Sequence, residues 1–184
     1  MDASLTKEKA DARKRAFAAR KTARMAGQGQ AAEILADVLS KYRGLPLAGY
    51  MPMRTEIDPL PAMAAHDGPV GVPVIIGVGQ ALRFREWSPG CAMIDGEFGA
   101  AIPADGIWIE PEILIVPLVG FDGRGYRLGY GGGFYDRTLE GLRAKRPTLA
   151  IGYAFSAQEL DQVPIEPTDQ KLDLIVTEKG VRQF

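Results

Sequence analysis

The chain has 184 residues, of which 46% are hydrophobic and 24% charged, so its composition is that of a folded globular protein and excludes a disordered tail. One cysteine, Cys91, and one histidine, His66, exclude a disulfide scaffold and a structural zinc site. The formal net charge of −1 at pH 7 excludes the strongly basic balance of a typical nucleic-acid-binding domain. The sequence contains neither an apolar signal segment at its charged start nor the run of about 18 apolar residues of a membrane-spanning helix. We therefore expect a single cytoplasmic domain over residues 1–184.

Two helices are expected at the start of the chain. Residues 4–26 are good helix formers without proline or glycine, and Gly27 ends the run. This segment is basic, because residues 1–25 hold eight lysines and arginines against three acids. Apolar residues at helical spacing over residues 34–39 then predict a second, amphipathic helix, antiparallel to the first.

The pattern then changes to short apolar runs that are typical of buried strands. These runs cover residues 45–53, 70–78, 113–119, 148–155 and 172–177. Helices are predicted between some of them. One covers residues 59–66, after the helix-start pair Asp58 and Pro59, and another covers residues 134–145.

Alternating strands and helices predict an α/β fold. We expect a mainly parallel sheet with helices on both faces, in a Rossmann-like three-layer arrangement, because parallel strands need crossover connections. Residues 81–108 interrupt the alternation. The charged residues among Leu82, Phe84 and Trp87 predict an inserted hairpin or an edge strand there.

The segment most informative about function is residues 113–145, an apolar run followed by a glycine-rich loop and a helical pattern. In such a segment, glycines let the backbone approach an anion, and N–H groups at the start of the helix point towards it. Arg127 adds a permanent positive charge. The sequence therefore favours a phosphate site, the alternative being that the glycines only form a sharp turn.

The loop also restricts the kind of phosphate ligand. It lacks the Gly-Lys-Ser/Thr of a P-loop, and the spacing of Gly129, Gly131 and Gly133 does not match the dinucleotide-binding fingerprint. Asp136 would repel a phosphate unless a divalent cation lay between them, which points to a nucleotide bound with Mg²⁺. The spacing is equally compatible with an Asp136 that only stabilises the first turn of the helix.

This segment also carries a specific resemblance. RLGYGGGFYDR (Arg127–Arg137), preceded by VPLVGFD (Val116–Asp122), resembles the signature of the 5-formyltetrahydrofolate cyclo-ligase family. Three further segments are similar to the family and occur in the same order: Lys9 with Arg13, YMPMRTEID (Tyr50–Asp58) and TDQKLDLIVTE (Thr168–Glu178). The resemblance thus extends over nearly the whole chain.

The resemblance implies an ATP-dependent ligase that cyclises 5-formyltetrahydrofolate to 5,10-methenyltetrahydrofolate and releases ADP and phosphate. It implies that the formyl oxygen, a poor leaving group, is phosphorylated before the neighbouring nitrogen attacks the activated carbon. Such chemistry needs positioning and charge neutralisation but no covalent nucleophile, so Cys91 and His66 are not required. The implied partners are a reduced folate and ATP, with neither nucleic acid nor membrane, and the implied state is a monomer.

Roles for individual residues also follow from the resemblance. It implies catalytic roles for Arg127 and Asp136, and it implies Mg²⁺ bound by Asp136 and Asp169. The residues similar to ATP contacts are Lys9, Arg13, Arg127, Leu128, Gly129, Tyr130, Gly131, Gly132, Gly133, Phe134 and Tyr135. The residues similar to folate contacts are Met51, Glu56, Tyr130, Gly131, Gly132, Gly133 and Phe134.

The residues by themselves leave other interpretations open. Lys9 and Arg13 share one helix face, which fits either a polyphosphate site or a solvated basic face. Met51 also fits a core position, and Asp169 also fits the cap of a turn. Related α/β folds host sugar-phosphate isomerases and acyl-transfer enzymes, and the basic first helix fits a nucleic-acid-binding module. The candidates for an aromatic cover of the pterin ring, which fit core packing equally well, are Phe98, Trp108 and Tyr130.

Overall fold

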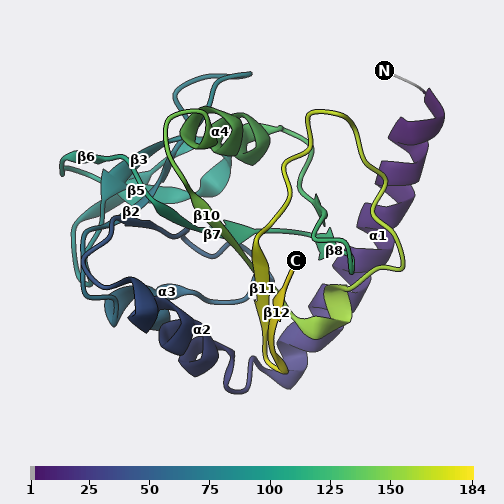
Figure 1. Ribbon diagram of the computed structural model, residues 1–184, viewed down its shortest axis with the longest axis horizontal. Coiled ribbons are helices and arrows are strands. Elements are labelled where there is room, and N and C mark those ends of the chain that lie inside the picture. Colours follow the sequence, from purple (N-terminus) through teal and green to yellow (C-terminus); the bar gives the residue numbers. More distant parts are fainter. Residues whose placement is uncertain (1–2) are drawn as a thin grey trace.

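A sheet between two layers of helices forms the body of the molecule, which the computed structural model describes over residues 3–184 (Figure 1). The helices in this range are α1 (Ala3–Ala26), α2 (Ala31–Leu39), α3 (Leu60–Ala64) and α4 (Phe134–Arg143), with the short 3-10 helices η1 (Ser40–Tyr42), η2 (Glu97–Gly99) and η3 (Ser156–Gln158). The strands are β1 (Leu47–Ala48), β2 (Val70–Val74), β3 (Arg83–Glu86), β4 (Met93–Asp95), β5 (Ala101–Pro103), β6 (Trp108–Ile109), β7 (Ile113–Pro117), β8 (Gly120–Phe121), β9 (Arg127–Leu128), β10 (Leu149–Tyr153), β11 (Leu174–Thr177) and β12 (Gly180–Gln183). None of the helices in this range is long and apolar enough to cross a membrane.

Within residues 3–184, the main sheet has eight strands in the order β12-β11-β10-β7-β1-β2-β3-β6. The central strands, from β11 to β2, run parallel to one another, whereas β12 at one edge and β3 and β6 at the other are antiparallel additions. In the register, Leu114 of β7 lies between Ala48 of β1 and Ala150 of β10. The mainly parallel sheet predicted from the alternating runs is confirmed.

Alternate residues of the central strands supply two hydrophobic cores, one on each face of the sheet. Ile113 and Ile115 of β7 belong to the core beneath α2 and α3, whereas Leu114 and Val116 pack in the core that includes Leu139 of α4. Burial of one such side chain stabilises the fold by about 1.5–3 kcal/mol. Because both faces of these strands are buried, they occur in the sequence as continuous apolar runs. The three-layer arrangement with helices on both faces is confirmed.

The segment 81–108 forms edge strands and an inserted hairpin, as predicted. In it, β3 pairs with β2 and β6 pairs with β3, so that both extend the sheet at one edge. The strands β4 and β5 form a separate two-stranded hairpin between them.

The first strand is much shorter than the predicted run of residues 45–53. It ends at Ala48, and Gly49 follows. A Cβ at Gly49 would lie 2.3 Å from the sulfur of Met63 on α3, so only glycine permits this approach of the helix to the sheet. Beyond Gly49 the apolar run belongs to a loop instead of a strand.

The first helix lies outside the three layers, beside the ends of the central strands (Figure 1). It contacts mainly η3, which follows β10, and β8, which follows β7. Small side chains allow this packing, since a Cβ at Gly120 would lie 3.3 Å from that of Ala16. The expected antiparallel pairing of α1 with α2 is wrong, because the buried residues of α1, namely Ala12, Ala16 and Arg20, offer no broad apolar stripe for another helix.

Candidate functional site

The strand order reverses between β1 and β7, since the chain adds β2 on one side of β1 and then β7 and β10 on the other. In open α/β sheets, a crevice forms at such a point, outside the carboxyl ends of the strands. The loop after β1 carries Met51 and Glu56, and the chain after β7 forms the β8–β9 hairpin and then the glycine loop, residues 129–133. The topology therefore brings two segments of the predicted site to one edge of the sheet.

The glycine loop connects β9 to α4, as the sequence predicts for a phosphate loop. Gly131 has φ of 101° and Gly133, which precedes α4, has φ of 64°, conformations that glycine adopts at little cost. The Arg13 guanidinium lies against the loop, with its Nε donating to the Gly129 carbonyl at 2.8 Å. Arg137 on α4 donates to the Gly132 carbonyl. Two cations thus border the loop.

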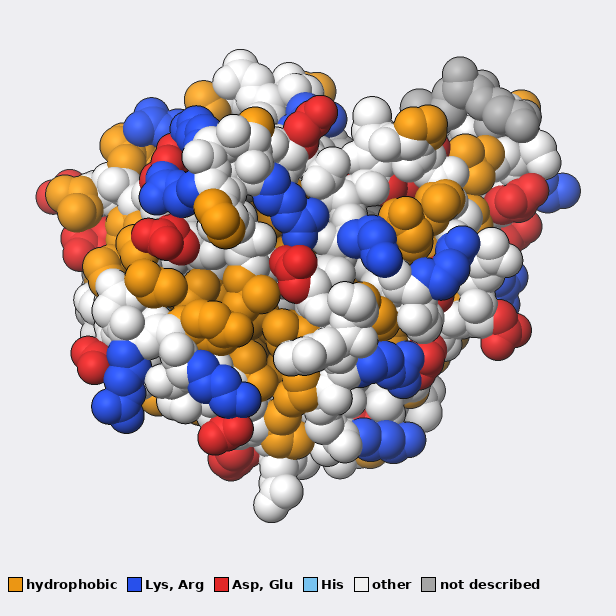
Figure 2. Space-filling view, in the orientation of Figure 1, with side chains coloured by type: hydrophobic (Ala, Val, Ile, Leu, Met, Phe, Trp, Pro, Cys, Tyr) orange, Lys and Arg blue, Asp and Glu red, His pale blue; other side chains and the backbone are white. Residues whose placement is uncertain are grey.

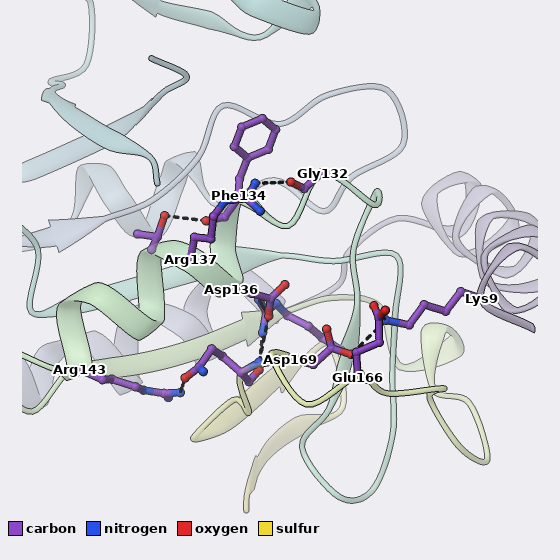
Figure 3. Close-up of polar contacts among 11 residues, drawn as sticks. Lys9, Gly132, Phe134, Asp136, Arg137, Arg143, Glu166 and Asp169 are labelled. Carbon is purple, nitrogen blue, oxygen red and sulfur yellow. Dashed lines mark hydrogen bonds and ion pairs between the residues drawn. The ribbon is translucent and has the colours of Figure 1, made fainter. Parts of the chain in front are cut away.

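Hydrogen bonds join the start of α4 to the loop before β11 (Figure 3). Asp136 Oδ1 accepts from the Arg127 guanidinium at 2.8 Å and from the Gln170 backbone N–H at 2.9 Å. The side chain of Arg127 is 4% exposed, and it also donates to the Gln170 carbonyl at 2.5 Å. Arg127 therefore fixes both Asp136 and the backbone at Gln170.

Asp169 lies beside this pair because it precedes Gln170 in the chain. Its Oδ2 accepts from Lys9 Nζ at 3.1 Å and from the Glu166 backbone N–H at 2.8 Å, and Lys9 also contacts Glu166 Oε2 at 2.7 Å. Burial opposes the charge of Lys9, but these hydrogen bonds raise its pKa above the ordinary value. Lys9 is therefore charged at neutral pH and ties α1 to this loop.

Each of the two predicted metal ligands has one carboxylate oxygen that accepts no hydrogen bond from residues 3–184. Within residues 3–184, the hydrogen bonds of Asp136 all go to Oδ1 and those of Asp169 all go to Oδ2. In nucleotide sites Mg²⁺ takes one or two carboxylates together with phosphate oxygens, and this pair fits that pattern. In the same part of the chain, no group of three or more His, Cys, Asp or Glu side chains is placed to hold a metal ion. We refer to the following residues as the carboxylate end of the site: Lys9, Arg127, Asp136, Glu166 and Asp169.

A second polar group lies where the loop after β1 meets the glycine loop. The Tyr130 hydroxyl donates to Glu56 Oε1 at 2.5 Å, and Glu56 Oε2 accepts from the Met53 backbone N–H at 2.8 Å. Glu56 is 5% exposed, and this burial raises its pKa above the ordinary value. Burial also raises the pKa of Tyr130, so its hydroxyl keeps its proton at neutral pH.

Arg20 completes this group, and the sequence analysis did not identify it. Its side chain is 1% exposed, donates to the Tyr130 hydroxyl at 2.8 Å and to Thr55 Oγ1 at 3.0 Å, and lies 4.0 Å from Glu56 Oε1. Arg13 and Arg20 are two helical turns apart and therefore lie on nearly the same face of α1. This spacing is the feature of the sequence from which a role for Arg20 could have been predicted. We refer to the following residues as the tyrosine end of the site: Arg20, Thr55, Glu56 and Tyr130.

One buried group between the two ends has no partner. The Tyr135 hydroxyl makes no hydrogen bond with the part of the chain that the structure describes. Burial, followed by the nearby charge of Glu56, raises the pKa of Tyr135, while Arg127 acts in the opposite direction. Since buried polar groups nearly always have partners, the hydroxyl of Tyr135 fits a site where a ligand supplies one.

The remaining predicted residues lie in different places. Met51 is half-buried and packs against the core beneath α2 and α3. Of the aromatic candidates, Tyr130 is part of the site, whereas Trp108 lies on the edge strand β6 with the guanidinium carbons of Arg83 and Arg85 4.0 and 4.6 Å from its ring centre. Phe98 is 71% exposed and lies next to the β4–β5 hairpin.

Comparisons with known proteins place the chain among folate-dependent cyclo-ligases by sequence and by fold. A model described as the 5-formyltetrahydrofolate cyclo-ligase family matches residues 97–178. A 5-formyltetrahydrofolate cyclo-ligase of Mycolicibacterium smegmatis is 31% identical over 166 residues, covering 80% of this chain and 82% of that protein. The 5-formyltetrahydrofolate cyclo-ligase of Escherichia coli K12 is 46% identical over 73 residues, and this match spans only 40% of either chain. The solved 5,10-methenyltetrahydrofolate synthetase of Aquifex aeolicus superposes with a TM-score of 0.74 at 29% identity, over 95% of this chain and 92% of that one.

Proposed function

Because the chain belongs to the 5-formyltetrahydrofolate cyclo-ligase family, we propose that it converts 5-formyltetrahydrofolate and ATP into 5,10-methenyltetrahydrofolate, ADP and phosphate. The observation that carries the proposal is the two-ended site, in which a glycine loop joins a carboxylate end suited to a polyphosphate to a tyrosine end suited to an organic substrate. A ligase that brings two substrates together needs such an arrangement.

The chemistry requires that the formyl oxygen first becomes a good leaving group. In the proposed reaction this oxygen attacks the γ-phosphorus of ATP and ADP leaves, which gives a phosphorylated formyl intermediate. The neighbouring nitrogen then attacks the formyl carbon, losing its proton, and the C–O bond breaks with release of phosphate. The protein supplies orientation and charge neutralisation in both steps, and no side chain forms a covalent bond.

We assign the ATP phosphates to the glycine loop and the carboxylate end. Backbone N–H groups at the start of α4, together with Arg13 and Arg127, would hold the phosphates. Mg²⁺, when bound by Asp136 and Asp169, would neutralise the phosphate charge. Lys9 holds Asp169 in place for this role, and we assign its ammonium group a contact with the phosphates as well.

We assign the folate to the tyrosine end, beside Met51. Both oxygens of Glu56 are acceptors, so its carboxylate suits the N–H groups of a pterin ring. Tyr130 offers an aromatic face that is partly exposed, and the glycine loop up to Phe134 adjoins it. With this assignment the reacting formyl group lies between the two ends, where the Tyr135 hydroxyl lacks a partner among residues 3–184.

We further propose that the protein acts as a single-domain cytoplasmic monomer. The main sheet, which has one core on each face, supports the single domain. Against a nucleic-acid-binding role, Lys and Arg side chains on the face in Figure 2 are interspersed with Asp and Glu and form no basic patch.

Mixing the purified protein with Mg²⁺, ATP and 5-formyltetrahydrofolate tests the function. We expect the absorbance of the conjugated methenyl product to grow and one ADP to appear per product, with no effect of nicotinamide cofactors. A sugar-phosphate isomerase or an acyl-transfer enzyme would work without ATP turnover. Ring closure that proceeds equally fast after ATP is removed would contradict the proposal.

A further inference from the structure

Arg20 has no role in the reaction as proposed above, although it is a fully buried cation. A buried charge is unfavourable unless its surroundings compensate it. Here Glu56 lies 4.0 Å away, and the Arg20 guanidinium carbon lies 5.0 and 5.7 Å from the ring centres of Phe17 and Tyr130. Arg20 and the other residues of the tyrosine end therefore stabilise one another.

The hydrogen bonds at this end favour one arrangement of protons. A guanidinium can only donate, so the Tyr130 oxygen must accept from Arg20. The single proton of Tyr130 then points to Glu56 Oε1, and the Met53 N–H occupies Glu56 Oε2. Both oxygens of Glu56 accept, so the arrangement favours the carboxylate form, and each oxygen keeps a lone pair for a further donor.

The surroundings of Glu56 shift its pKa in opposing directions. Burial raises the pKa of Glu56, whereas the hydrogen bonds from Tyr130 and Met53 and the charges of Arg20 on α1 and Arg54 in the loop after β1 lower it. The phenols of Tyr50 and Tyr135 also lie within electrostatic range of Glu56. Of the two cations, Arg54 is exposed to solvent, whereas Arg20 is buried and its charge is therefore less screened.

We propose that Arg20 is a positioning residue for folate binding, which directs the Tyr130 proton onto Glu56 and so holds Glu56 as a carboxylate ready to accept from the folate. This inference rests on the proposed function, in which Glu56 contacts the folate. It gives α1 a second task, because the helix that carries Lys9 and Arg13 to the carboxylate end also prepares the folate end. Arg20 itself touches neither substrate.

Steady-state kinetics between about pH 5 and pH 8 test the proposal on wild type and Arg20→Met. Without Arg20, the Tyr130 hydroxyl is free to turn and Glu56 gains a proton more readily. We expect the KM for folate to rise about tenfold or more and the KM for ATP less than about threefold. The acidic limb of kcat/KM for folate should move up by about one pH unit. Equal effects on both substrates with an unshifted limb would overturn the proposal.

Three further variants separate positioning from folding. Arg20→Lys keeps a cation that donates, so it should recover part of the loss, whereas Lys21→Met on the exposed side of the same helix should behave as wild type. Tyr130→Phe removes the hydroxyl through which Arg20 acts. The losses of Arg20→Met and Tyr130→Phe should therefore combine to less than their sum in the double variant, and full additivity would contradict the proposed route.

A measurement on the protein without substrates distinguishes a failure of this proposal from a failure of the proposed function. The carbon-13 shift of the Glu56 carboxyl group, followed against pH, reports its ionisation directly. We expect its pKa to be higher in Arg20→Met than in wild type, and an unchanged pKa would refute the action of Arg20. If the wild type shows this titration behaviour yet neither binds nor converts 5-formyltetrahydrofolate, the proposed function is wrong and the link from Arg20 to Glu56 stands.

Discussion

The two ends of the site hold their charges in different ways. At the carboxylate end the charges occur in pairs that solvent still reaches, with side-chain exposures of 26% for Asp136 and 16% for Asp169. At the tyrosine end, Arg20 and Glu56 are buried, and the neutral hydroxyl of Tyr130 is hydrogen-bonded to both. Partly exposed charges rearrange readily when a ligand arrives, whereas a buried set is fixed in advance. The difference suits an end that takes a hydrated polyphosphate with its cation and an end that takes a flat organic ring.

The largest expected effect is at the carboxylate end, from Asp136→Asn. The change removes one metal-binding charge, so turnover should fall about 100-fold or more and the Mg²⁺ requirement should rise. A lower melting temperature should accompany it, since Arg127 loses its charged partner. Glu110→Gln is the control, because Glu110 pairs with Lys145 beyond the other end of α4 and should leave the Mg²⁺ titration unchanged.

An unchanged Mg²⁺ titration in both Asp136→Asn and Asp169→Asn would contradict the assignment of Mg²⁺ to the carboxylate end, and with it the contrast between the two ends. The two carboxylates would then serve only to hold Arg127, Lys9 and the loop before β11 in place.

The next effect in size concerns the cations that α1 brings to the phosphates. Removing Lys9 or Arg13 should deprive ATP of charge-assisted hydrogen bonds and raise its KM about ten- to a hundredfold. Single Ala variants of Lys14 and Lys21, which are exposed on the same helix, are the controls and should stay within about twofold. If the KM for ATP changes equally little in all four variants, α1 is not part of the ATP site. Loss of RNA or DNA binding in all four would favour the nucleic-acid alternative.

A smaller effect should distinguish the substrates at the tyrosine end. Met51 is half-buried against the core, so Met51→Ala removes apolar surface beside the proposed folate position. We expect the KM for folate to rise about 5- to 30-fold, for the loss of about 1–2 kcal/mol of contact, and the KM for ATP to change less. The opposite order would mean that the two ends have been assigned to the wrong substrates.

The smallest effect is expected outside the site, at Glu159 and Arg182, where both side chains are more than a third exposed. The hydrogen bond from Arg182 lowers the pKa of Glu159, so the pair stabilises the fold above the ordinary glutamate pKa and loses this effect as the pH falls through the lowered value. Glu159→Gln should reduce the free energy of unfolding in urea by less than about 1 kcal/mol at pH 7, and high salt should abolish the difference. A larger, salt-independent loss would show that exposure does not set the strength of ion pairs in this protein.

Much of the fold could be predicted from the sequence because the signals are local and repeated. Buried parallel strands produce apolar runs, and the glycine loop before α4 has a characteristic composition, so the sheet, the helices on both faces and the inserted hairpin were all predicted. The position of α1 was not, because a helix whose buried residues are Ala12, Ala16 and Arg20 gives almost no amphipathic signal for its packing partner.

The site could be predicted only where it follows a motif. Lys9, Arg13, Glu56, Asp136 and Asp169 were named from the resemblance, and the structure brings them to one edge of the sheet. Arg20 was missed because arginine is mostly exposed in proteins and its burial depends on partners far away in the chain. Gln170 was missed because it acts through its backbone N–H and carbonyl, which every residue type except proline provides.

The length of α1 fixes the spacing between the two ends of the site. Lys9 and Arg20 are eleven residues apart, which an α-helix converts into about 16 Å along its axis with both side chains on nearly the same side. One residue inserted between them would turn Arg20 by about 100° away from Tyr130 while leaving the surroundings of Lys9 in place. If the phosphates and the pterin ring bind as proposed, the number of residues between Lys9 and Arg20 sets the distance between them. We therefore expect α1 to tolerate exchanges on its exposed side far better than any change in its length.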